Sequence, residues 1–299
     1  MKFIKLPIVL IFILFAENTF AEDTSSAKKN FFSRFTDSIS GSLKNLIRGD
    51  SSGDTEVQIN AGEDYHPTFS IMTVKPLATH PGVDAWFVQF QLNEQKVRGS
   101  GRLSTNLGLG YRQLSDSKNA MTGANLFLDY DAEGNARGSI GLELRTTAFE
   151  AIANYYSALS SGITVGSYTE RTLDGIEVSL VGEIPYFPWA SIIVNSYEWQ
   201  AEKNSKNSNG EKYSLELTLT QNFILEGGAE DNNIDGSANF IKAYFVFPPR
   251  DRISATTNFI GESAFSQGNM SGELLSKIRR INNQVIESEG SGVVMARSN

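Results

Sequence analysis

The chain has 299 residues, no cysteine and a net charge of −8 at pH 7. The absence of cysteine excludes disulfide bonds and thiol catalysis, and an acidic balance without a basic patch argues against nucleic acid as a partner. Hydrophobic residues make up 40% of the chain. A membrane β-barrel can have this ordinary proportion, because its lipid-facing and lumen-facing residues alternate.

The N-terminus predicts export. Lys2 and Lys5 come before an apolar run over residues 6–16, and the small residue Ala21 closes the polar stretch that follows. This order is typical of a secretory signal peptide, here residues 1–21. An uncleaved anchor helix is the alternative, although the run is shorter than the roughly 20 apolar residues that span a bilayer. No other stretch is apolar enough to form a transmembrane helix.

Residues 22–54 are expected to form a periplasmic N-terminal segment after cleavage. Within it, residues 31–48 place Phe35, Ile39 and Leu43 near helical spacing. This periodicity predicts a short amphipathic helix.

Between residues 55 and 247 the hydrophobic period changes to two. Leu126 and Leu128 fall on one face of a strand, with Asn125 and Asp129 on the other. This alternation predicts β-strands with one apolar and one polar face. Twelve strands are expected, near residues 55–62, 68–77, 84–93, 103–114, 119–130, 137–146, 148–158, 173–184, 189–199, 212–221, 223–231 and 237–247.

The connections between these strands favour a membrane barrel over a soluble β-sandwich. Connections after odd-numbered strands include long ones at residues 94–102, 160–172 and 200–211, whereas those after even-numbered strands are tight. Outer-membrane barrels have long extracellular loops and short periplasmic turns. A sandwich has no reason to separate loop lengths by parity.

The stretch 248–299 is expected to lie outside the barrel wall as a C-terminal linker. Pro248 and Pro249 cannot continue a paired strand, which places the end of the barrel at residue 247. Residues 250–267 have no regular pattern, residues 272–281 are predicted to form one short helix, and residues 282–289 are predicted to be extended.

Several motifs in series resemble the intimin/invasin family, the inverse autotransporters. They lie at residues 107–112 (LGLGYR), 123–131 (GANLFLDYD), 141–143, 168–171 (YTER), 174–176, 182–188 (GEIPYFP), 197–198 and 278–287 (IRRINNQVIE). The resemblance covers roughly residues 55–288, and the order of the motifs is kept.

This resemblance implies an all-β fold: a twelve-stranded antiparallel transmembrane β-barrel in the bacterial outer membrane. A short periplasmic helix would precede the barrel, and a linker would thread the pore outward to carry an adhesive passenger. The implied partners are outer-membrane lipid, the barrel-assembly machinery, periplasmic chaperones and a host or cell-surface receptor. The sequence ends at residue 299, so any receptor would be reached through a passenger that is absent or on a separate chain.

Two groups of site residues follow from the facing of the strands and from the resemblance. Six polar residues are expected to face the lumen or its rim: Asn125, Asp129, Glu143, Arg145, Glu177 and Glu183. They could hold the linker, or they could simply hydrate a water-filled interior. Four residues are the expected linker contacts to that lumen: Arg279, Arg280, Asn282 and Asn283.

Enzyme chemistry is not expected. The chain has only two histidines, His66 and His80, which the expected topology places on opposite sides of the membrane. No cofactor motif is present, since Gly108-Leu-Gly110 falls within a strand and not in a phosphate loop. The sequence therefore predicts a translocator barrel that lacks a sizeable passenger. The alternative is a porin-like channel or structural barrel plugged by its own tail, and a barrel enzyme is the least favoured hypothesis.

Overall fold

The structure is a computed structural model that describes residues 53–62, 65–204, 206–249, 252–289 and 292–294. The predicted signal peptide and the predicted N-terminal helix lie outside these residues. Among the residues that are described, no helix is long and apolar enough to cross a bilayer.

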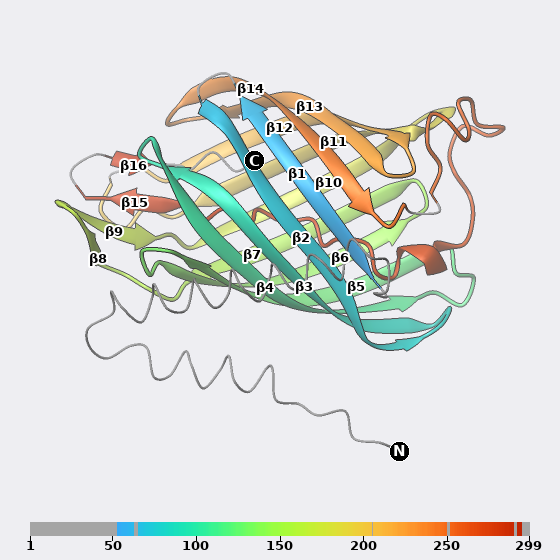
Figure 1. The fold of residues 1–299 in the computed structure, drawn as a ribbon, viewed down its shortest axis with the longest axis horizontal. Helices are drawn as coiled ribbons and strands as arrows, with labels where there is room; N and C mark the ends of the chain where they lie inside the picture. Colours follow the sequence, from blue (N-terminus) through green and yellow to red (C-terminus); the bar gives the residue numbers. More distant parts are fainter. Residues whose placement is uncertain (1–52, 63–64, 205, 250–251, 290–291, 295–299) are drawn as a thin grey trace, which may run out of the picture. The chain divides into compact units, whose positions relative to one another are not determined.

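Twelve strands close into one antiparallel barrel (Figure 1). They are β1 (Asp54–Gly62), β2 (Tyr65–His80), β3 (Asp84–Val97), β4 (Ser100–Leu114), β5 (Ala120–Asp131), β6 (Ala136–Thr146), β7 (Phe149–Ala158), β10 (Gly175–Ile184), β11 (Phe187–Trp199), β12 (Ser208–Thr220), β13 (Phe223–Asn232) and β14 (Gly236–Phe247). Each strand pairs with the next, and β14 pairs back with β1, with Ile59 opposite Ala243. The expected twelve-stranded all-β barrel is confirmed.

The barrel has two unlike ends. At the turn end lie the tight connections after β2, β4, β6, β10 and β12, together with the start of β1 and the end of β14. At the loop end lies the long connection between β7 and β10, which carries two further strands, β8 (Ile163–Val165) and β9 (Tyr168–Thr172). The sequence pattern did not predict these two strands.

The prediction of a long loop at residues 94–102 is wrong. Strand β3 continues to Val97 and β4 begins at Ser100, so only Arg98 and Gly99 form the turn. Both have positive φ angles, 53° and 78°, which is the geometry that joins strands in a two-residue hairpin. The pairing of β3 with β4 continues through this stretch to Val97 and Ser100, so these polar residues belong to two strands and not to a loop.

Apolar side chains face outward from the barrel and polar side chains face inward. On β5, Leu126 is 56% exposed while its neighbour Asn125 is 5% exposed, and β6 and β10 alternate in the same way. Closing the sheet pairs the backbone groups of every strand, so an apolar outer surface can face lipid without an open edge.

The C-terminal part runs along the turn end and then into the barrel. We name residues 252–269 the strap and residues 270–289 the tail. The tail begins with the 3-10 turn η1 (Met270–Glu273) and ends in β15 (Ile286–Ser288), which pairs with β9 and with β16 (Gly292–Val294). Figure 1 draws it in red inside the strands.

The helix predicted at residues 272–281 is wrong, because only the four residues of η1 are helical. The apolar residues Met270, Leu274 and Ile278 are spaced as in a helix, but they pack into two separate clusters inside the barrel. Side chains of the barrel wall, described below, satisfy the backbone of the tail, so the chain gains nothing from helical hydrogen bonds at this place.

Candidate functional site: the tail inside the barrel

The tail crosses the lumen from one end of the barrel to the other. At the turn end, the N–H of Met270 donates to the carbonyl oxygen of Lys118, at 2.8 Å. Farther along, Ile281 and Val285 pack in a cluster with Trp199 near the loop end. Met270 also packs in an apolar cluster with Leu114 on β4. Apolar contacts therefore hold the tail at both ends of its path, where burial removes its side chains from water.

Side chains of the wall take the place of a strand partner for the tail. The Oε1 atoms of Gln89 and Gln95 accept from the N–H groups of Ile278, at 2.7 Å, and Gln284, at 3.0 Å. Arg112 donates to four carbonyl oxygens of the tail, the nearest two at 3.0 and 2.5 Å. Buried backbone groups need partners, and these contacts supply them to an extended chain.

Two cations of the tail bind three strands of the wall. Lys277 lies 2.9 Å from Glu56 on β1. Arg279 lies 3.1 Å from Glu150 on β7 and 2.8 Å from Glu216 on β12. Because β7 and β12 are not neighbours in the barrel, Arg279 braces the tail between separate parts of the wall.

A third cation completes the set on the opposite wall. Both terminal nitrogens of Arg280 donate to Asp129 on β5, at 2.8 and 2.7 Å. Asp129 also accepts from Arg137 and Asn106, each at 2.8 Å. The four nitrogen atoms that donate to this carboxylate all belong to buried side chains, so losing the negative charge would leave two guanidinium groups uncompensated.

The exit of the tail is held by the loops of the loop end. Ile286 on β15 lies opposite Thr172 on β9, in an antiparallel pair. The buried carboxylate of Glu287 accepts from three consecutive backbone N–H groups, those of residues 202–204, at 2.7, 2.8 and 2.8 Å. These contacts join the tail to two different loops.

Comparison with known proteins identifies the group to which this arrangement belongs. A family model described as the inverse autotransporter β-domain matches residues 13–282. The chain belongs to this family. The resemblance inferred from the sequence motifs is thus confirmed, and the protein is an outer-membrane β-barrel.

One solved structure supports the fold of this inverse autotransporter barrel. A membrane-protein chain from work on in-meso crystallization shares 19% identity, with 79% of this chain and 99% of that chain covered and a TM-score of 0.65. Two others have TM-scores below 0.5: an outer-membrane channel from Pseudomonas putida F1 (10% identity, 66% and 96% covered, TM-score 0.47) and the KdgM porin with disordered oligogalacturonate (6% identity, 64% and 98% covered, TM-score 0.44). A search of curated proteins finds no match.

The six residues expected to face the lumen all have buried side chains: Asn125, Asp129, Glu143, Arg145, Glu177 and Glu183. Three of them join Asp129 in binding the tail or its partners. Glu177 accepts from the N–H of the tail residue Ile281, at 3.0 Å, and Arg145 donates to the hydroxyl of Ser276, at 2.6 Å. Glu143 pairs with Arg112, at 2.6 Å, and so orients a side chain that binds the tail.

The other two inward residues are placed differently. Glu183 accepts from the N–H of Ser266 in the strap, at 2.8 Å, so it lies at the rim. Neither amide atom of Asn125 has a hydrogen-bond partner within the described part of the chain.

The four expected linker residues differ in how they bind the wall. Arg279 and Arg280 make the ion pairs described above. Asn282 accepts from Asn106 through its carbonyl oxygen, at 3.0 Å, and from Arg280 through its side chain, at 3.1 Å. The side chain of Asn283 accepts from Asn93, at 2.5 Å.

Several contacting residues of the inverse autotransporter site were missed from the sequence. They are Glu56, Gln89, Gln95, Arg112, Glu150, Glu216, Lys277 and Glu287. Those on the wall occupy inward positions of strands in which polar and apolar residues alternate. This alternation is the signal that could have found them. The alternation shows which face of the barrel wall a side chain occupies, but it does not show which residue of the tail it contacts. Glu150 and Arg279, for example, are 129 residues apart in the sequence.

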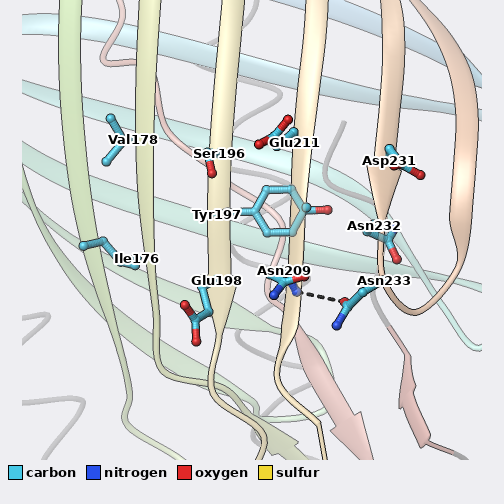
Figure 2. Close-up of a pocket in the computed structure, with 11 residues that line it drawn as sticks. Ile176, Val178, Ser196, Tyr197, Glu198, Asn209, Glu211, Asp231, Asn232 and Asn233 are labelled. Carbon is cyan, nitrogen blue, oxygen red and sulfur yellow. Dashed lines mark hydrogen bonds between the residues drawn. The ribbon is translucent and has the colours of Figure 1, made fainter.

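Two hollows remain near this site. One, of about 120 Å³, lies in the lumen beside the tail and is lined by Glu226, Lys242 and Lys277 among others. Another, of about 570 Å³, opens on the outer side of β10–β13 near the loop end (Figure 2). It carries carboxylates, but no group of His, Asp or Glu in the described ranges could hold a metal ion.

Proposed function

We propose that this protein is an outer-membrane anchor and translocator that holds its own C-terminal segment threaded through its pore. The observation that carries the proposal is the continuous path of the tail, from its contact with Lys118 at the turn end to its pairing with β9 at the loop end. Short turns face the periplasm in outer-membrane barrels. On this basis the strap is periplasmic and β15 lies at the cell surface.

Export and assembly follow from the same proposal. Residues 1–21 act as a cleaved signal peptide, and residues 22–54 stay in the periplasm. Periplasmic chaperones and the barrel-assembly machinery then deliver and fold the barrel, with outer-membrane lipid around it. A chain segment joined to the tail would be displayed outside, where it could meet a receptor.

A second candidate function is a porin-like channel that its own tail plugs. The hollow of about 120 Å³ beside the tail favours it, because charged and polar side chains of β12–β14 line a space that the tail does not fill. That volume accommodates a small group of waters. The two functions differ in whether the tail end reaches the cell surface and in whether the pore conducts.

Surface exposure of the C-terminus tests the translocator proposal. With an epitope tag after Asn299, we expect added protease to remove the tag from intact cells, because β15 lies beyond the loop end. A second variant carries the same tag after Gly268, in the strap, where it should stay protected until the outer membrane is opened. The proposal fails if the tag after Asn299 is protected in intact cells.

A further inference from the structure

The strap follows the rim of the turn end and binds several turns of the barrel in succession. Ala255 donates to Thr218 near the end of β12, at 2.9 Å. Tyr186, in the turn between β10 and β11, accepts from Gly261, at 2.9 Å. Thr147, between β6 and β7, donates to Ser266, at 2.7 Å. The strap is therefore fixed to the barrel along its length and does not hang free.

The strap presents large apolar side chains to the outside. Phe259 is 58% exposed and Ile260 is 64% exposed. Phe259 stacks on Trp189, with ring centroids 5.5 Å apart, and Trp189 donates to the carbonyl oxygen of Phe259, at 3.0 Å. Farther along, Phe265 lies 5.1 Å from Phe149, an outward residue of β7. The apolar outer wall thus continues onto the strap at Phe259 and at Phe265.

An apolar groove of about 440 Å³ lies in the outer wall next to these rings. Its sides include Leu144, Phe149, Leu180 and Ile192, all exposed. Gly182 forms its floor, opposite Phe149 on one strand and Ile192 on the other. With no side chain at that position, the wall is recessed between two large apolar residues.

We propose that the strap and this groove form a phospholipid-binding site of the inner leaflet, with an acyl chain in the groove and Phe259 and Ile260 in the membrane interface. The groove is continuous with the lipid-facing wall, and its lining surface is mostly apolar, which fits a hydrocarbon chain better than a polar ligand. Aromatic residues gather where outer-membrane barrels meet the headgroup region. The choice of leaflet rests on the proposed function, which places the turn end toward the periplasm.

Depth-dependent fluorescence quenching tests the strap. In a background with Trp86, Trp189 and Trp199 changed to phenylalanine, single tryptophans are introduced as Ile260→Trp on the strap, Leu142→Trp on the wall and Asp116→Trp on an exposed turn. We expect phospholipid brominated near the headgroup end of its acyl chains to quench I260W at least as strongly as L142W, while D116W is quenched only by aqueous acrylamide. An I260W signal that behaves like that of D116W overturns the proposal.

Retention of lipid tests the groove with variants closer to the natural chain. A Cβ at Gly182 would meet only the Phe149 ring, at 3.6 Å, so Gly182→Leu fills the groove without displacing the backbone. Ala153→Leu places the same leucine side chain at an exposed wall position outside the groove. We expect phospholipid to co-purify with the unsubstituted protein and with A153L, and to be lost from G182L. Equal retention by all three, or none by the unsubstituted protein, overturns the groove assignment.

These experiments distinguish a failure of the lipid-binding proposal from a failure of the proposed function. If L142W is not quenched, the barrel is not in the bilayer and the proposed function fails as well. If I260W is quenched but the tag after Asn299 is protected on intact cells, the contact with lipid stands and the assigned orientation falls.

Discussion

At the scale of single residues, the interior is organised around ion pairs that join the tail to the wall. Asp129 is the most connected carboxylate, since it binds Arg280 from the tail and Arg137 from β6. All three side chains are fully buried. Pairs of this kind favour one position of the tail in the barrel, because shifting the tail along the lumen would separate buried charges from their counter-charges.

Removing the charge of Asp129 should destabilise the folded barrel. Asp129→Asn keeps the shape of the side chain but leaves Arg137 and Arg280 without their counter-charge, a change that costs about 3–5 kcal/mol for buried pairs. We expect the temperature at which the compact barrel converts to the unfolded form on a gel to fall clearly for D129N. Asp116→Asn, at an exposed turn position, is the control. Equal transition temperatures for D129N and D116N would contradict the assigned role.

At the scale of elements, the small sheet at the loop end decides where the tail leaves the barrel. Strand β15 adds to the β8–β9 hairpin, while Glu287 accepts the backbone N–H groups of residues 202–204 from a different loop. Consecutive N–H groups that converge in this way form an anion-binding concavity. A carboxylate of the tail therefore keeps two surface loops together.

Glu287→Gln should loosen this exit. Charge-assisted hydrogen bonds contribute about 1.5–3 kcal/mol, and a loss of about 1.4 kcal/mol corresponds to a tenfold change in an equilibrium constant. Amide hydrogen exchange in residues 200–207 should then accelerate by about tenfold or more. Glu289→Gln is the matched control, because Glu289 is an exposed partner of Arg171 and surface pairs are weak. Similar exchange rates in E287Q and E289Q would refute the role of Glu287.

At the scale of the whole molecule, the barrel is a closed ladder that does not depend on the tail for its hydrogen bonds between strands. Strand β1 pairs with β14 through a continuous register from Thr55 to Gly62. The tail instead fills the lumen, with four apolar clusters and three cations binding the inner wall. The wall and the plug are therefore separable parts.

Deletion of residues 270–299 should leave a folded, open barrel. Without the tail, the lumen becomes a water-filled channel lined by inward polar side chains, so we expect the conductance in planar bilayers to rise well above that of the full chain. Circular dichroism and compact migration on a gel should show that the strands persist. If conductance is unchanged by the deletion, the tail is not the element that closes the pore.

Sequence periodicity predicted the wall well because it is a local property. Each strand of a barrel repeats the same alternation, so Asn125, Asp129 and Glu143 could be assigned to one face from their neighbours alone. Arg279 and Arg280 were found only through the motif around residues 278–287. The partners of Arg279 were out of reach, since Glu150 and Glu216 carry no mark that separates them from other inward carboxylates.

The failures have a common physical cause. The spacing of Met270, Leu274 and Ile278 favours a helix, yet these residues pack into clusters at different depths of the lumen. Similarly, β9 forms where β15 provides a partner strand. Local propensity contains no information about a partner strand more than a hundred residues away. Tertiary contacts outweigh local preference where a segment lies inside a shaped channel.

The sequence by itself determined that this protein is a barrel. Period-two alternation, tight turns on one end and serial family motifs are encoded along the chain and need no contact between distant residues. Only the tertiary structure decided what fills the barrel and how it is held. That outcome depends on ring closure, which brings Glu56, Asp129 and Glu216 from separate strands around one extended tail, and on the side chains that take over its hydrogen bonds.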